Sequence, residues 1–220
     1  MNNNKRTHEI QIDTEKGDIK SYSKVIKEIK KQFYQKFQAK INVNYPYIIS
    51  YNNNNNLLSA LGLRPANNNK LYVENYFQDC IEDIINNANI KNINVENITR
   101  KEVIEIGSFC SNRPINAFIL LKLLVGLSST TKYKWAVFTA TESLVNFLTR
   151  QNYEINIISD AHKNNNKDLS SKWGIYYDCN PKIIIMNIEK SYKNIHCVKK
   201  NHIFISSYQK DLLMISKIIN

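Results

Sequence analysis

Apolar side chains recur at helical spacing in the first part of the chain. Over residues 21–40 they stand three or four positions apart, with lysines between them: Tyr22, Val25, Ile26, Ile29, Phe33 and Phe37. This spacing predicts an amphipathic helix. A lysine-rich helix of this kind can also lie on an anionic membrane. We favour a helix that covers a sheet, because the sheet predicted below needs its face buried.

The rest of the chain alternates between strand-like and helix-like segments. Strands are predicted over residues 8–13, 45–51, 57–63, 71–73, 102–109, 134–140, 154–159, 182–188 and 202–206. Helices are predicted over 75–86, 114–127, 141–151 and 208–218, with Thr141 as an N-cap. Polar runs predict a hairpin loop at 52–56, a turn at 67–69, a linker at 93–97 and a loop at 161–171.

The order of these segments indicates the fold class. Strands and helices alternate in the second half, which predicts a partly parallel sheet, and the hairpin-rich first half adds antiparallel strands. The layout resembles that of the GNAT acyltransferases and of the acyl-homoserine-lactone synthases, which share one core. The resemblance implies an α/β (α+β) fold: a GNAT-like mixed, strongly twisted central sheet with helices on both faces.

The net charge and its distribution indicate which kinds of binding partner to expect. The formal net charge is +11, from 30 Lys and Arg against 19 Asp and Glu, but only five of the basic residues are arginine. The lysines are scattered, and asparagine, isoleucine and tyrosine are abundant with them, which is typical of an AT-rich genome. A nucleic-acid-binding protein concentrates its cations on one face or interleaves them with aromatics. We therefore expect no nucleic acid, and favour an acidic partner or an anionic group.

The cysteines and the apolar runs suggest a cytoplasmic protein. The four cysteines lie far apart without a C-x-x-C pair, which predicts reduced thiols and no metal site. Residues 1–7 are polar and carry no signal-peptide pattern. The most apolar run, residues 115–127, is shorter than the roughly 20 residues that span a bilayer.

One strand-to-helix junction carries candidate chemistry. Glu105 precedes a run of small and polar residues, and a helix then begins at Pro114 beside Arg113. A helix N-terminus next to a cation suits a phosphate, although an ordinary turn has the same pattern. Glu105 is a candidate general base or an ion-paired residue. Cys110 is a candidate nucleophile, but a buried structural thiol is the better interpretation.

Five ordered motifs resemble the thermostable hemolysin family of bacteria. They are GLRPA at 62–66, LYVENY at 71–76, EIG at 105–107, VFTAT at 137–141 and WGIYY at 173–177, followed by Pro181. The resemblance covers about residues 47–188. It divides the chain into an N-terminal extension with the first amphipathic helix (1–44), a GNAT-like acyltransferase core (45–190) and a C-terminal strand and helix extension (191–220).

The resemblance implies two classes of function. The fold implies an N-acyltransferase that moves an acyl group from acyl-CoA or an acidic acyl carrier protein to a small amine. The family name implies a membrane-active lytic toxin instead, and a non-catalytic GNAT-like binding module is a third possibility. Where the family usually has Glu-Val-Gly-Asn-Leu-Ala, this chain has Glu-Ile-Gly-Ser-Phe-Cys at 105–110, so the role of Ser108 is open.

The acyltransferase interpretation assigns roles to particular residues. Glu105 is the catalytic candidate. The candidates for holding the donor carbonyl and phosphates are Ser108, Cys110, Ser111 and Arg113. The candidates for contacting the acyl group or the acceptor are Arg64, Glu74, Thr139, Thr141, Trp173, Tyr176 and Tyr177. The acyl thioester enters as a substrate, and no resident cofactor is expected.

Overall fold

A computed structural model describes residues 7–54, 56–67, 70–87, 98–162 and 172–220. Its strands form one seven-stranded sheet in the order β1-β2-β3-β4-β5-β7-β6. Neighbouring strands run antiparallel except β4 and β5, which are parallel. The strands are β1 (His8–Thr14), β2 (Tyr47–Asn53), β3 (Asn56–Pro65), β4 (Val103–Ser111), β5 (Trp135–Ala140), β6 (Ile155–Asp160) and β7 (Lys182–Asn187). The GNAT-like mixed sheet is therefore confirmed.

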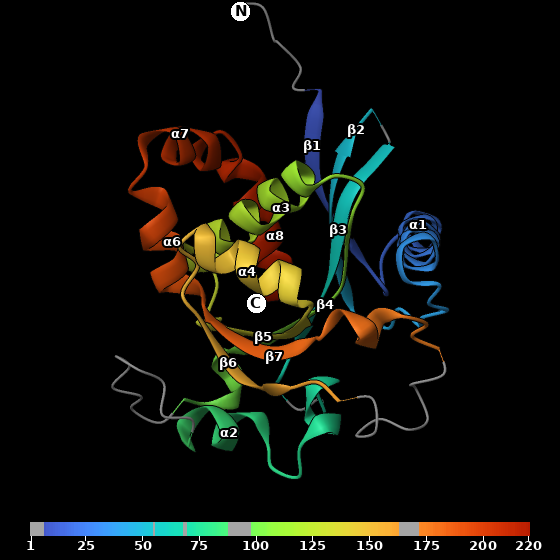
Figure 1. Ribbon diagram of the computed structural model, residues 1–220. Helices are drawn as coiled ribbons and strands as arrows, with labels where there is room; N and C mark the ends of the chain where they lie inside the picture. The colour runs from blue at the N-terminus through green and yellow to red at the C-terminus, as the bar shows by residue number, and fades with distance from the viewer. Residues whose placement is uncertain (1–6, 55, 68–69, 88–97, 163–171) are drawn as a thin grey trace, which may run out of the picture.

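Helices cover both faces of this sheet (Figure 1). On one face, α3 (Pro114–Gly126), α4 (Glu142–Arg150), α6 (Ile188–His196) and α8 (Gln209–Ile219) close the largest apolar core. On the opposite face, α1 (Ile19–Phe37) packs over β2 to β4, and α2 (Ile81–Asn87) packs over β5 and β7. The two helices on the second face bury separate clusters, which leaves a gap between them.

The first helix has the buried side that its pattern predicts, but it spans Ile19–Phe37 rather than 21–40. Asp18 is the N-cap, and its carboxylate accepts from the N–H groups of Lys20 and Ser21 at 2.9 and 3.3 Å. The helix ends where Gln38 adopts a left-handed conformation. Its inward residues Ile29 and Phe33 are buried against the sheet. The prediction that this helix covers the sheet is thus confirmed.

Two predicted strands are wrong. Residues 202–206 lie in α7 (Lys199–Ser207), because the run is short, apolar and able to bury Ile205 equally well from a helix. The expected C-terminal strand and helix is therefore three helices, α6 to α8. Residues 71–73 lead into a 3-10 turn, η1 (Val73–Tyr76), and the helix expected from residue 75 begins only at Ile81.

The remaining segments differ only at their ends, or cannot be compared. The loop between β2 and β3 is shorter than the expected 52–56, because the asparagines extend both strands as the pair Asn53 and Asn56. The helix over 114–127 is largely buried, although Ile115 at its start is exposed. The predicted linker at 93–97 and most of the predicted turn at 67–69 and loop at 161–171 lie outside the described residues.

Candidate active site

A cavity of about 290 Å³ lies on the second face of the sheet, in the gap between the α1 and α2 clusters. Its floor comes from β3, β4 and β5, and its walls come from residues 41–45, 70–75 and 172–173. The cavity sits where the pairing of β4 with β5 ends. The two strands pair only from Val103↔Trp135 to Glu105↔Val137, yet both continue beyond. Gly107 and Ser108 line one side of this divergence and Thr139 the other.

A β-bulge at Ser108 shapes the β4 side of the cavity. Gly62 pairs with Gly107 and Ala60 with Cys110, so two residues of β4 stand opposite one of β3. Ser108 carries the left-handed φ of 50° that absorbs the extra residue. A bulge removes backbone groups from the ladder and bends its strand. Polar backbone groups at this point can therefore face the cavity instead of a neighbouring strand.

Glu105 and Arg64 form a cross-strand pair on the cavity floor. They are directly opposite each other on β4 and β3, and Arg64 Nη1 lies 3.3 Å from Glu105 Oε2. The second Arg64 nitrogen, Nη2, donates to the carbonyl of Asn44. The side chain of Glu105 is 1% exposed, which makes this an ion pair of the buried type rather than a surface pair.

Burial raises the pKa of Glu105 to about 7. Three neighbours oppose that rise: the backbone N–H groups of Val73 and Tyr72 and the cation of Arg64. The Val73 N–H donates to Glu105 Oε1 at 2.8 Å. A carboxyl group with a pKa near neutrality can accept and release a proton at physiological pH, as a general base must.

Tyr45 forms a lid over two glycines beside this pair. A Cβ on Gly62 would stand 2.4 Å from Tyr45 Cγ, and one on Gly107 would stand 1.7 Å from Tyr45 Oη. Both glycines face the cavity side of the sheet and pair with each other. The Arg64 guanidinium stacks over the same ring at 4.9 Å. The two glycines thus leave room for the buried Tyr45 ring to lie against the strands, and this ring holds the Arg64 guanidinium in place.

The structure brings five of the predicted site residues to this cavity: Arg64, Glu105, Ser108, Thr139 and Trp173. Two more stand directly behind them. The Tyr176 hydroxyl lies 3.4 Å from both Thr139 Oγ1 and the Thr139 carbonyl oxygen. Its ring contacts Trp173 at 5.0 Å between centroids. The Tyr177 hydroxyl lies 2.8 Å from that of Tyr76, so these two tyrosines support the wall.

The other predicted residues lie outside the cavity. Arg113 is exposed at the N-cap of α3, and Ser111 Oγ donates to its carbonyl at 2.6 Å. Thr141 is the N-cap of α4 as predicted, but its side chain makes no capping hydrogen bond. Glu74 is buried and paired with Arg100, on the far side of η1 from the cavity.

Cys110 is buried among the apolar residues under α1. Burial raises the pKa of its thiol to about 12, so almost no thiolate forms near neutral pH. We predict that iodoacetamide labels the exposed Cys80 and Cys197 at least about 100-fold faster than Cys110, by mass spectrometry of the folded protein. Rapid labelling of Cys110, or loss of function in Cys110→Ala, would restore it as a nucleophile.

Several cavity residues were not predicted from the sequence. They are Ile41, Asn42, Asn44, Tyr45, Lys70, Tyr72, Asn75 and Lys172. A signal for Tyr45 existed, since two of the chain's five glycines fall inside strands, each two residues from Arg64 or Glu105. The lysines and asparagines carried no such signal, because both residue types are frequent throughout the chain.

A family model assigns the chain. The model described as thermostable hemolysin matches residues 16–192, which extends the sequence resemblance back to the start of α1. The chain belongs to the thermostable hemolysin family. No curated protein sequence is a significant match to this hemolysin-family chain. Within the part of the chain that the structure describes, no helix is long and apolar enough to cross a membrane. Those same residues contain no cluster of three metal-ligating side chains.

Solved structures share the fold of this hemolysin-family chain. The acyl-homoserine-lactone synthase LasI matches with a TM-score of 0.57 at 10% identity, over 86% of this chain and 94% of that chain. TofI, in a ternary complex with an inhibitor and MTA, matches with a TM-score of 0.57 at 8% identity, over 85% and 96%. MesI, a CoA-dependent acyl-homoserine-lactone synthase, matches with a TM-score of 0.53 at 10% identity, over 86% and 93%. The fold that the sequence predicts, the one shared with the acyl-homoserine-lactone synthases, is therefore confirmed.

Proposed function

We propose that this protein is an N-acyltransferase that moves an acyl group from a thioester donor, acyl-CoA or an acyl carrier protein, to an amine. The observation that carries the proposal is a buried carboxyl group, Glu105, with a pKa near 7 beside the divergence of β4 and β5. The shared fold with acyl-homoserine-lactone synthases supports it.

The geometry suits aminolysis of a thioester. The thioester carbonyl would enter between β4 and β5, where the Ser108 bulge provides polar backbone groups to its oxygen. Glu105 would take a proton from the attacking amine as the carbon–nitrogen bond forms. The carbon–sulfur bond then breaks, and the departing thiolate takes up a proton. The proton that Glu105 took from the amine is passed to this thiolate, directly or through water, so the reaction returns Glu105 to its starting state and needs no oxidant.

The charge of the cavity indicates the charge of its substrates. Arg64, Lys70 and Lys172 line it, and Glu105 is the single carboxylate among the lining residues that the structure describes. Arg64 is engaged with Glu105 and Asn44, which leaves the two exposed lysines at the rim. A donor with phosphates, or an acceptor amine that also carries an acid group, complements this rim.

Donor binding is the first test. We expect a series of acyl-CoAs or acyl carrier proteins to raise the melting temperature, with complexes visible by native mass spectrometry. A ligand at 100 times its Kd stabilises a protein by about 2.7 kcal/mol. Thr139→Phe, which fills the gap beside β4, should remove the shift. The same change at the exposed Thr149 of α4 should not.

Two further outcomes separate binding, catalysis and lysis. Glu105→Gln should keep the donor-induced shift while losing acyl transfer to a panel of amines. The family description suggests membrane lysis. However, α1 and α3, the helices such an activity would use, pack apolar side chains into the cores of this fold, among them Phe33 of α1 and Leu120 of α3. No shift with any thioester, together with dye leakage from anionic liposomes, would overturn the proposal in favour of lysis.

A further inference from the structure

One segment, described over residues 66–67 and 70–82, forms the wall of the cavity next to Glu105. Lys70, Leu71, Tyr72, Val73 and Asn75 all line the cavity from this segment. It carries the Val73 N–H that donates to Glu105 Oε1. The segment includes the short 3-10 turn η1 and otherwise lacks regular structure up to Ile81 among its described residues. Side-chain contacts must therefore fix its shape.

Glu74 ties the middle of this segment to its own ends. Its carboxylate accepts from the Leu71 N–H at 2.7 Å and from the Ile81 N–H at 3.0 Å. Ile81 is the first residue of α2, so Glu74 also caps that helix. Its side chain is 6% exposed. Burial alone would raise the pKa of Glu74, but Arg100 and the two N–H groups lower it below its usual range.

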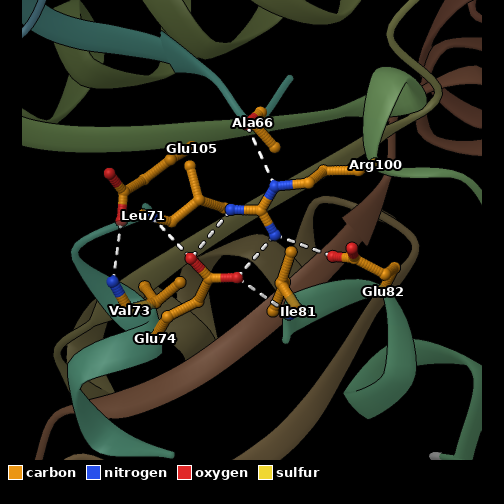
Figure 2. Close-up of polar contacts among 8 residues, drawn as sticks. All are labelled: Ala66, Leu71, Val73, Glu74, Ile81, Glu82, Arg100 and Glu105. Carbon is orange, nitrogen blue, oxygen red and sulfur yellow. Dashed lines mark hydrogen bonds and ion pairs between the residues drawn. The ribbon is translucent and has the colours of Figure 1, made fainter. Parts of the chain in front are cut away.

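Arg100 holds the segment from outside at three points. Its guanidinium meets Glu74 with two nitrogens, Nη1 at 2.6 Å and Nη2 at 2.9 Å. Its Nε donates to the Ala66 carbonyl at 3.1 Å, and its Nη1 lies 2.7 Å from Glu82 Oε2. These contacts reach the beginning, the middle and the end of the segment. Figure 2 shows Val73 reaching Glu105 while the neighbouring Glu74 faces Arg100.

Arg100 is also coupled to Glu105 through the chain. It lies in η2 (Arg100–Glu102), which leads directly into β4 five residues before Glu105. One side chain therefore connects the strand that carries the candidate base to the wall that supplies the base's hydrogen bond. We propose that Arg100 is a positioning residue for Glu105, because its contacts with Ala66, Glu74 and Glu82 clamp the segment so that the Val73 N–H stays against the Glu105 carboxylate.

The inference rests on the proposed function, in which Glu105 is the base, but its physical content can be measured without a substrate. Without Arg100, the buried Glu74 carboxylate would lose its cation. Keeping that charge buried and unpaired costs more free energy than moving the segment so that water reaches Glu74. The segment would then loosen, and Glu105, which Arg64 and Tyr45 still cover, would lose an N–H that favours its charged form. The other charged or titratable groups that act on Glu105 are Arg64, Glu74 and Tyr45. Arg64 and Tyr45 lie outside the segment and remain in place, whereas Glu74 moves with it.

The test is a titration of Glu105 by NMR in protein labelled with ¹³C at the glutamate carboxyl carbon, assigned with Glu105→Gln. We expect Arg100→Ala to raise the pKa of Glu105 by about one. We also expect the Val73 amide to exchange with solvent at least about tenfold faster. Arg100→Lys, which keeps the charge but not the fork of donors, should give intermediate values. In active protein, the acidic limb of the kcat/KM profile should move to higher pH with the same order of variants.

A matched variant separates positioning from general loss of stability. Leu212→Ala removes a buried side chain of α8, in the core on the opposite face. It should lower the melting temperature without altering the Glu105 titration or Val73 exchange. An Arg100→Ala protein that behaves like Leu212→Ala would overturn the inference.

Two remaining outcomes are also decisive. If Arg100→Ala does not fold, Arg100→Lys and Glu82→Gln take its place, and unchanged Glu105 and Val73 in both would contradict the clamp. A wild-type protein that transfers no acyl group to any amine would contradict the proposed function alone, since the titration and exchange do not depend on turnover.

Discussion

Replacing Glu105 by glutamine is expected to lower the rate of acyl transfer by about 10²–10⁴-fold while the chain stays folded. Glutamine has the shape of glutamate, and its oxygen can still accept the Val73 N–H. It cannot take a proton from an amine. The wild-type enzyme should show the same dependence on an unprotonated Glu105. Its kcat/KM should fall as the pH drops below about 7, because the base then becomes protonated.

The same substitution should change how stability depends on pH. The pKa of Glu105 is about 7 in the folded protein against an ordinary 4.5, so the folded state holds a proton that the unfolded state releases between these values. Stability from this group is therefore full below about pH 4.5, falls as the pH rises towards 7, and is constant above it. The difference corresponds to roughly 3 kcal/mol. Urea unfolding should show Glu105→Gln gaining on the wild type by about that amount between pH 4.5 and 8.

Glu102→Gln provides the matched control. Glu102 lies in η2 three residues earlier and forms a surface ion pair with Lys134, which is expected to contribute little. Glutamine also fits the capping box that Glu102 makes with Thr99. This variant should leave the rate and the pH dependence near those of the wild type. Equal behaviour of the two variants would remove Glu105 from the role of base.

Gly107→Ala is expected to destabilise the protein by about 1–3 kcal/mol and to weaken binding in the cavity. The new methyl group would stand 1.7 Å from Tyr45 Oη, so the ring must move. Tyr45 is buried and carries the stacked Arg64 guanidinium, so this movement also disturbs the cation paired with Glu105. Thermal unfolding and the donor-induced shift in melting temperature measure the two effects.

A double-mutant cycle tests whether the ring is the cause. Tyr45→Leu removes the atoms that the methyl group would meet, and Gly107→Ala should then cost much less in that background than in the wild type. Gly126→Ala is a control, because its added Cβ would meet only side-chain atoms at 3.0 Å in the opposite core. Equal costs of Gly107→Ala with and without Tyr45 would contradict the proposed contact.

More of the fold than of the candidate site could be predicted from the sequence. Alternating strands and helices after residue 100 predicted the sheet, and Glu105 could be recognised from its place on a strand before a buried helix. Residues 202–206 could not be resolved, because a short apolar run fits a helix as well as a strand. Tyr45 and Arg100 depend on contacts between residues about 20 to 60 positions apart, which local patterns do not contain.

The parallel junction between β4 and β5 divides the sheet into two antiparallel blocks, β1-β2-β3-β4 and β5-β7-β6. Each block is made from a nearly continuous stretch of chain, residues 8–111 and 135–187. Only three registered residue pairs, Val103↔Trp135 to Glu105↔Val137, form the seam between them. Beyond this seam β4 and β5 have no registered pairs with each other, so the space between them can receive a substrate without the loss of a strand pairing. Glu105 stands in the last registered pair, where the two blocks begin to separate.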